Sequence, residues 1–352
     1  MPVSPTVLLT GASGVVGTAL LHELTHCHVI ALVHRTPCPG ADESVVGDLT
    51  GTRFGLDAAA YARLAARVDV VVHCAAITSF SAGPAATHRL NEAGTGEVLR
   101  FTEAADAVLH HVSTAFVARR ELTRTGAASG DATARPEDYL DSKRAGEEAV
   151  RASGVPAVIV RPSVVIGDST TGRIATFQGM HGIVHALLRE LLPLVPVPAD
   201  SRVDFVPQDV VARSIAALIA EGRRDGEAWI TAGAAAPTAQ RVLELTGKVA
   251  ADLGVPMRIP RTVGPDMVDR LIRPVFISAL HPRARRTFDD LLAMTALFAG
   301  ADAFPSTLGH TPASVAALTP GGIESAYEAS VRHIARARGL VRTARAAEVA
   351  PR

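Results

Sequence analysis

The sequence predicts an α/β protein: a doubly wound parallel sheet with a smaller, mostly helical C-terminal lobe. Three observations lead to this fold class. The apolar segment Thr6–Thr10 runs directly into a glycine turn over 11–17, and an amphipathic helix follows to about Leu24. The segment 69–73 contains three consecutive valines, and strands buried on both faces of a parallel sheet have such continuous apolar runs. Beyond Thr238 the pattern becomes helical, with repeated proline breaks.

Length and composition narrow the class of protein. A chain of 352 residues accommodates one large α/β domain with a second lobe. The formal net charge is zero, so neither nucleic acid nor an anionic membrane surface is an expected partner. The N-terminus lacks a basic region of the signal-peptide type, and no apolar run approaches the roughly 18 residues of a membrane span. The three cysteines lack metal-ligand spacing, so we expect no metal site and a reducing, cytoplasmic location.

The glycine turn after the first strand is typical of dinucleotide-binding proteins, because it lies between a strand and a helix. In such turns the first glycine permits the tight bend, the second lets the backbone approach a pyrophosphate, and the third lets the helix pack closely. The helix N-terminus attracts the phosphates. A purely structural glycine turn is the alternative. The residues expected to contact the dinucleotide here are Gly11, Ser13, Gly14, Val15, Val16 and Gly17.

The second predicted strand, His28–Val33, indicates which dinucleotide is bound. NAD-selective chains place an acidic residue at its end to hold the ribose 2′-hydroxyl. Here the strand is followed by His34 and Arg35. Arginine suits a 2′-phosphate through paired hydrogen bonds, so these residues favour NADPH. The alternative is a solvated arginine at a strand end.

Two further segments are expected beside the cofactor. A short strand over 45–49 includes Asp48 and Leu49 at its end, and Asp48 is positioned to accept a hydrogen bond from the adenine amine. A turn or N-cap aspartate is the competing interpretation. After the strand over 69–73, Ala75 and Ala76 are small enough for the cofactor to pass over the backbone.

A tyrosine and a lysine at helical spacing give the best indication of chemistry. The chain contains three tyrosines and only two lysines, yet Tyr139 and Lys143 lie four residues apart. A helix predicted over 136–152 places both side chains on one face. An adjacent ammonium stabilises a phenolate, which makes a phenol a better acid–base group at neutral pH. The alternative is a surface tyrosine beside a solvated lysine.

A hydroxyl is expected near this pair. The strand predicted over 107–112 ends in Ser113 and Thr114, and open α/β sheets bind ligands at the carboxyl ends of their strands. Thr114 is therefore a candidate for holding a substrate oxygen. Serine and threonine also cap or turn at strand ends, so a structural role is the alternative.

These motifs together resemble the extended short-chain dehydrogenase/reductase family. The resemblance extends over roughly residues 6–232 and is carried by Thr10-Gly11-x-x-Gly14-x-x-Gly17, Asp48, Ser113-Thr114, Tyr139-x-x-x-Lys143 and Arg161-Pro162-Ser163. It implies a Rossmann fold in which Tyr139 donates and accepts the proton and Thr114 orients the substrate oxygen. Lys143 would hold the nicotinamide ribose and lower the pKa of the tyrosine. The residues implied to lie against the nicotinamide are Pro162, Ser163 and Val165.

Within that family several stretches are similar to the fatty acyl and thioester reductase branch, the male sterility type. These stretches are 112–117, 161–168, Thr171-Gly172-Arg173 and 203–207. The resemblance implies NADPH-dependent reduction of a small-molecule or carrier-bound carbonyl, an acyl thioester or the derived aldehyde, on an acyl carrier protein or coenzyme A. Three alternatives stay open: a steroid- or dihydroflavonol-type ketone or alcohol oxidoreductase, a sugar-nucleotide epimerase or dehydratase, and a non-catalytic NADP-binding sensor.

The expected domain organisation divides the chain into three parts. They are an NADP-binding domain over 1–165, completed by about 203–232, a substrate-binding lobe from 166–202 and 233–340, and a poorly ordered tail over 341–352. The elements expected in the second half are a helix over 183–192, strands over 203–206 and 228–231, and amphipathic helices around 284–298 and 322–338. The last two helices could cover a substrate cleft or form an oligomer surface, so the oligomeric state stays open.

Overall fold

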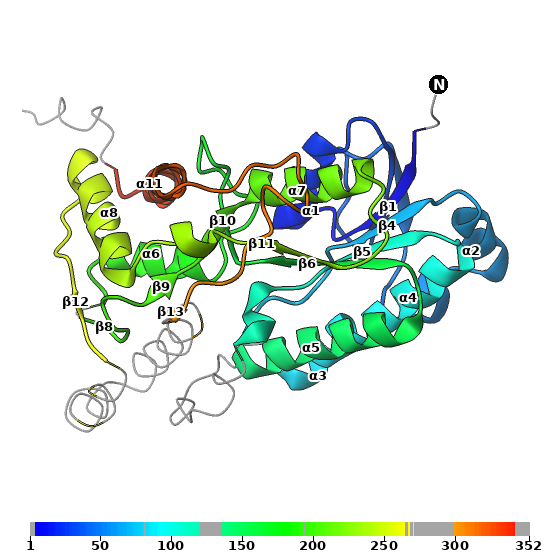
Figure 1. Cartoon of the computed structure of the whole chain (residues 1–352), viewed down its shortest axis with the longest axis horizontal. Coiled ribbons are helices and arrows are strands. Elements are labelled where there is room, and N and C mark those ends of the chain that lie inside the picture. The colour runs from blue at the N-terminus through cyan, green and yellow to red at the C-terminus, as the bar shows by residue number, and fades with distance from the viewer. Residues whose placement is uncertain are drawn as a thin grey trace, which may run out of the picture.

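The structure is a computed structural model of the chain. It describes residues 4–80, 82–119, 136–192, 194–264, 267, 270, 297, 299–300 and 302–341. A seven-stranded sheet lies between two layers of helices, and a smaller, mainly helical lobe lies beside it (Figure 1). No helix within the described ranges combines the length and the apolar character needed to cross a membrane.

The main sheet has the order β11-β6-β5-β4-β1-β2-β3, and each neighbouring pair is parallel. Its strands are β1 Thr6–Thr10, β2 His28–Val33, β3 Glu43–Val46, β4 Val70–His73, β5 Val108–Val112, β6 Ala157–Pro162 and β11 Glu227–Ile230. The strand order reverses between β1 and β4, and the carboxyl ends of the strands leave a crevice at such a point. The predicted doubly wound parallel fold is confirmed.

Helices cover both faces of this sheet. On one face lie α1 Val15–Glu23 and α7 Gln208–Ala220, and on the other lie α2 Ala58–Ala65, α3 Pro84–His88, α4 Gly94–Ala104 and α5 Pro136–Ser153 (Figure 1). Successive residues of β1 point to the two layers: Val7 and Leu9 belong to the core on the α1 and α7 side, whereas Leu8 belongs to the core on the α4 side. Because the central strands are buried on both faces, their sequences lack the alternation of half-exposed strands.

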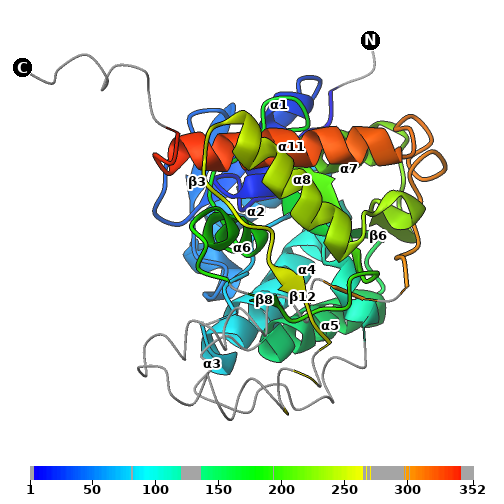
Figure 2. The ribbon, with the colours of Figure 1, turned by 90° about the vertical axis from the view of Figure 1, so that its left-hand side faces the viewer.

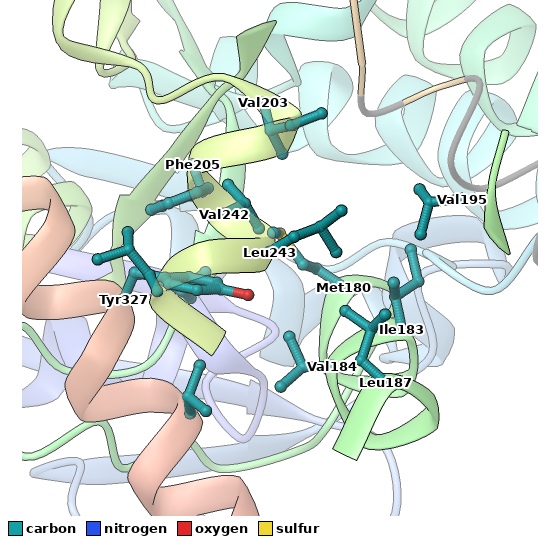
Figure 3. Packing of buried hydrophobic residues seen from close by; sticks show 14 of the residues in the cluster. Met180, Ile183, Val184, Leu187, Val195, Val203, Phe205, Val242, Leu243 and Tyr327 are labelled. Carbon is teal, nitrogen blue, oxygen red and sulfur yellow. The ribbon is translucent and has the colours of Figure 1, made fainter. Parts of the chain in front are cut away.

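The lobe has a core of its own. It is formed by α6 Met180–Leu188, α8 Ala239–Asp252 and α11 Pro320–Ala337, which lie close together in Figure 2. Figure 3 shows Tyr327 of α11 beside Phe205, and the two ring centroids are 5.0 Å apart. Full burial of aromatic and aliphatic side chains of this size contributes about 1.5–3 kcal/mol each. Three short strand pairs complete the lobe: β7 Val164–Ile166 with β10 Phe205–Pro207, β8 Leu194–Val195 with β12 Arg261–Thr262, and β9 Arg202–Val203 with β13 Ala299–Gly300.

Two predicted strands are interrupted by aspartates that bond the main chain. The strand expected over 45–49 ends at Val46, because Asp48 forms a turn in which its carboxylate accepts from the amide of Thr50 at 2.8 Å. The strand expected over 203–206 is split into β9 and β10 at Asp204. The buried Asp204 carboxylate accepts hydrogen bonds from the amides of residues 232 and 233, at 2.8 and 2.9 Å.

Other expected elements agree with the structure within a few residues. The helix expected over 183–192 begins earlier, at Met180, and ends at Leu188, because Glu190 adopts a left-handed backbone conformation with φ 52°. Most of the helix expected around 284–298 and almost all of the tail over 341–352 lie outside the described residues. The domain boundaries at 165 and 233 stay predictions.

Candidate active site

The glycine turn is built so that larger residues do not fit. Gly11 has φ +70°, and a Cβ on it would lie 2.6 Å from the amide nitrogen of Ala75. A Cβ on Gly17 would lie 2.2 Å from the carbonyl oxygen of Gly11. Gly11 is therefore required for the turn and for the close approach of the loop after β4, and Gly17 for seating α1 on the turn. No side chain caps α1 at Gly14, so its first amides are available to an anionic ligand.

A cavity of about 410 Å³ lies on the β2 side of this turn. Seven of the predicted cofactor residues line it: Gly11, Ser13, His34, Arg35, Asp48, Leu49 and Ala75. The Asp48 carboxylate lies 3.8 Å from Nε2 of His34. Hydrogen bonds from the Thr50 amide and hydroxyl lower the pKa of Asp48, so its carboxylate is charged and able to accept from an amine. A charged carboxylate and an arginine beside a glycine turn are polar groups of the kind that bind the adenosine half of a dinucleotide.

A second cavity, of about 210 Å³, extends from the same turn across the carboxyl ends of β5 and β6. The other predicted site residues line it, together with Gly11: Gly14, Val15, Val16, Gly17, Ala76, Thr114, Tyr139, Lys143, Pro162, Ser163 and Val165. Every residue predicted for the site therefore lines one of the two cavities, which meet at Gly11. The individual roles assigned to these residues stay predictions.

Tyr139 and Thr114 come from different elements and meet in the second cavity. Tyr139 lies on α5, whereas Thr114 caps the 3₁₀ turn Ala115–Ala118 that follows β5. Burial raises the pKa of Tyr139 to about 12, and hydrogen bonding to the Thr114 hydroxyl opposes this rise. The sequence led us to expect a phenol made more acidic by its neighbour. In the structure the loss of solvation raises the pKa of Tyr139 instead, and the opposing contribution comes from Thr114, not from Lys143.

Lys143 follows Tyr139 by four residues on α5, and its buried side chain contacts the sheet. Its Nζ donates to the carbonyl oxygen of Val112 at 2.7 Å. Burial lowers the pKa of Lys143 to about 8, and the charge of Glu147 opposes this fall. His73, 2.7 Å from the Thr10 hydroxyl, has a pKa lowered to about 3, chiefly by burial and also by the charge of Lys143. Among the described residues that line the second cavity, Lys143 is the only one with a charged side chain at neutral pH.

Arg161, part of the resemblance noted above, holds α5 in place. Its guanidinium donates to both oxygens of Glu147 on α5 and to Glu227 on β11, and it lies over the Trp229 ring at 4.5 Å. Burial by itself raises the pKa of Glu147, but the hydrogen bonds from Arg161, Ser113 and Arg151 and the charge of Arg161 together outweigh burial, and the pKa is lowered. This ion pair ties α5 to β6, and so positions the helix that carries Tyr139 and Lys143.

Asn91 connects the loop after β4 to the same helix, a contact that the sequence did not predict. Its Oδ1 accepts from the amide of Ile77 at 2.8 Å, and its Nδ2 donates to the carbonyl of Ile77 and to Oγ of Ser142, both at 3.0 Å. Ser142 directly precedes Lys143. Asn91 therefore positions the cavity wall relative to the catalytic candidates.

The residues that complete the second cavity on its substrate side were not among the predicted site residues. They are Thr78, Phe80, Phe116, Gln178, Gly179, Met180 and Leu297. These residues come from four separated segments and share no motif. Gln178, Gly179 and Met180 lie in the segment 166–202 expected to belong to the substrate-binding lobe, and Leu297 lies in the piece over 284–298 expected to cover a cleft. Phe116 lies in the stretch 112–117 that carries the family resemblance. Within the described part of the chain, no group of three His, Cys, Asp or Glu residues is placed to hold a metal ion.

The chain is similar to known proteins in sequence and in fold. A family model described as "Male sterility protein" matches residues 42–215. The hybrid PKS-NRPS synthetase poxE of Penicillium oxalicum is 31% identical over 230 residues, which are 59% of this chain and 6% of the synthetase. The chain therefore spans only a small part of the length of this curated relative.

Two solved structures are similar over almost the whole chain. The terminal R domain from the myxalamid PKS-NRPS biosynthetic pathway matches with a TM-score of 0.72 and 20% identity, covering 97% of this chain and 93% of that one. A thiolation-reductase di-domain from an archaeal non-ribosomal peptide synthetase matches with a TM-score of 0.69 and 15% identity, covering 96% and 76%. At these identities the likeness concerns the fold. The family match includes Thr114, Tyr139 and Lys143, and residues 42–215 belong to the male sterility family of NAD(P)-dependent reductases, a branch of the extended short-chain dehydrogenase/reductases.

Proposed function

We propose that the chain is an NADPH-dependent reductase that converts an acyl thioester, held on a carrier protein or coenzyme A, into an aldehyde. One observation carries the proposal: the Tyr139 phenol, the Thr114 hydroxyl and the Lys143 ammonium line one cavity with the glycine turn. The names of the similar structures, an R domain and a thiolation-reductase di-domain, support the thioester as substrate. A thiolation domain holds its acyl group as a thioester, which is the bond that such a reductase would cleave.

The chain's own groups suit this reaction. Bound NADPH would supply the hydride for the carbonyl carbon. Thr114 and Tyr139 would hold the carbonyl oxygen by hydrogen bonds, and Tyr139 would donate its proton to that oxygen. The resulting hemithioacetal loses its thiol and leaves an aldehyde. Lys143 would stabilise the phenolate that remains until the tyrosine is reprotonated.

NADPH, rather than NADH, is the proposed cofactor because of the end of β2. Arg35 is exposed and lines the adenosine cavity beside His34, and no acidic residue follows the strand directly. We expect Arg35→Ala to raise KM for NADPH by roughly tenfold, because paired charge-assisted hydrogen bonds to a phosphate are lost, and to leave KM for NADH unchanged. Equal changes for the two cofactors would contradict the assignment.

The substrate is tested by following NADPH oxidation with an acyl thioester, an aldehyde and a ketone of equal chain length. We expect thioester turnover with one free thiol released for each aldehyde formed, measured with a thiol reagent. Reduction of the ketone alone, with no thiol released, would overturn the proposal in favour of a ketone reductase. If the aldehyde is also a substrate, a second hydride gives the alcohol, and product analysis after complete turnover shows whether two or four electrons are transferred.

A further inference from the structure

The second cavity has two chemically different ends. Its inner wall includes the apolar side chains of Phe116, Met180 and Leu297, which are only 3%, 6% and 2% exposed. At its outer end it is lined by Thr78 and Gln178, whose side chains are polar and exposed. The cavity therefore opens to solvent past two polar groups and closes on an apolar wall.

Thr78 and Gln178 form a bridge between the two halves of the molecule. Thr78 lies in the loop after β4, and Gln178 lies just before α6, yet the Thr78 hydroxyl donates to Oε1 of Gln178 at 2.9 Å. The main chain of Gln178 is also held, because Nδ1 of His181 lies 2.8 Å from its carbonyl oxygen. Phe80, two residues beyond Thr78, packs against the Tyr139 ring with centroids 5.6 Å apart. The bridge is thus close to the candidate proton donor.

The shape of the cavity decides which part of a thioester each end receives. A carrier protein cannot enter a cavity of this kind, so the thiol arm must leave through the open end. The acyl group then extends toward the apolar inner wall. Both carriers present the same arm, pantetheine, whose first secondary amide lies two methylene groups from the sulfur. A carboxamide and a hydroxyl together offer the donors and acceptors that a secondary amide requires.

We propose that the Thr78–Gln178 bridge is a recognition site for the sulfur-proximal amide of the pantetheine arm. This inference rests on the proposed thioester reductase function and deepens it. The bridge binds the thiol part of the substrate and positions its carbonyl for Tyr139, whereas Phe116, Met180 and Leu297 receive an apolar acyl group. Neither bridge residue takes part in proton transfer, so both act as positioning residues.

The test compares two thioesters of one fatty acid, an N-acetylcysteamine thioester, which contains the amide, and an S-propyl thioester, which lacks it. In Gln178→Met, which keeps the length of the side chain, we expect KM for the amide-containing thioester to rise about five- to tenfold, the loss from one or two hydrogen bonds. KM for the S-propyl thioester and kcat for both should stay within about twofold. Thr78→Val, of equal shape, should have the same selective effect. Gln240→Met removes an exposed carboxamide on α8 that donates to Glu244, and it serves as the matched control.

The outcomes separate this inference from the proposed function. If the wild-type protein reduces both thioesters and the variants change neither KM, or change both equally, the bridge only joins the two halves and the inference is overturned. A purely structural role would lower the melting temperature of the variants, which circular dichroism measures. It would also raise KM for both thioesters together. If the wild-type protein reduces neither thioester but reduces a ketone, the proposed function fails and the inference fails with it.

Discussion

Two regions of the molecule contain almost the same pair of side chains. Tyr139 and Tyr327 each lie on an 18-residue helix that begins with proline, α5 and α11. Each phenol is associated with a threonine hydroxyl: Tyr139 with Thr114, and Tyr327 with Thr246, at 2.8 Å. Burial raises the pKa of both phenols above the ordinary value. Local chemistry alone therefore does not distinguish an acid–base group from a core residue.

The surroundings do distinguish them. Tyr327 is 1% exposed and packs on Phe205, and four residues further along its helix is Val331, also buried. Tyr139 lines a cavity that opens to solvent, and the residue four positions on is Lys143. A phenol hydrogen-bonded to a threonine is thus a packing residue where it is buried in a closed core. It becomes a candidate for catalysis only where a substrate has access and a cation lies on the same helix face.

Removing each hydroxyl in turn tests this comparison with the largest expected effect. Tyr139→Phe should lower kcat/KM for thioester reduction by about 10³-fold, because general acid catalysis is lost, and leave NADPH binding nearly unchanged. Tyr327→Phe should keep full activity and lower the free energy of unfolding by about 1 kcal/mol. The loss is small because Thr246 still donates to the carbonyl of Val242. Steady-state kinetics and urea unfolding measure the two effects, and an active Tyr139→Phe enzyme would remove the basis of the comparison.

The two lysines provide the second contrast. Lys143 is 3% exposed in the cavity wall, whereas Lys248 is exposed on α8 and pairs with Glu328. We expect Lys143→Met to lower kcat/KM by roughly a hundredfold, since the phenolate loses its stabilising charge. Lys248→Met should leave activity unchanged and alter the free energy of unfolding by less than about 1 kcal/mol, as exposed ion pairs do. Equal activity losses in the two variants would show that charge removal acts through general destabilisation.

Replacing the two threonines, Thr114 and Thr246, should distinguish the two regions by a smaller effect than the tyrosine and lysine variants. Thr114→Val should lower kcat by about tenfold, the value of one hydrogen bond to the substrate oxygen, with little change in stability. Thr246→Val should instead leave the buried Tyr327 hydroxyl without its partner and cost about 1–3 kcal/mol of unfolding free energy, with kcat retained. Steady-state kinetics and denaturation curves measured for both variants check that Thr114→Val affects activity and Thr246→Val affects stability. Loss of activity in Thr246→Val under conditions where it is fully folded would contradict it.

The smallest effect is expected in the pH dependence. Because the pKa of Lys143 is about 8, kcat/KM for reduction should fall as pH rises through that value, and the fall should be absent in Lys143→Met. Stability changes in the opposite direction. The folded-state pKa lies below the ordinary 10.5, so between pH 8 and 10.5 the unfolded chain binds more protons and the contribution of this lysine to stability rises with pH. The Lys248→Met variant should follow the wild type in both measurements, and a pH profile unaffected by Lys143→Met would refute the assignment.

The cofactor side and the substrate side of the cavity differ in how far the sequence predicts them. On the cofactor side, residues 11–17, the pair at 34 and 35, and Asp48 each follow a strand of the parallel sheet. In such a sheet every strand ends at the same edge, so identifying the strands was enough to bring these residues together. The glycines are predictable in part for the same reason, because the positive φ of Gly11 and the contact of Gly17 with Gly11 are local to one turn. The contact of Gly11 with Ala75 is not local, since it comes from the loop after β4.

The substrate side follows from no such rule. Thr78 and Gln178 are a hundred residues apart, and they meet only because the segment before α6 lies against the loop after β4. Met180 and Leu297 line the same cavity through contacts of equally long range. The residues next to these side chains in the sequence form no motif, so neither spacing nor composition predicts that they line the cavity.

By itself the sequence determined the parallel sheet, the dinucleotide turn and the Tyr139 and Lys143 pair, because each depends on short-range spacing along one strand or helix. Only the tertiary structure decided that Tyr139 faces an open cavity while Tyr327 is sealed in a core, and that burial dominates the pKa values of Tyr139 and Lys143. Solvent access and desolvation are properties of the packed whole. They depend on which distant segments cover a side chain, and that information is absent from the residues on either side of it.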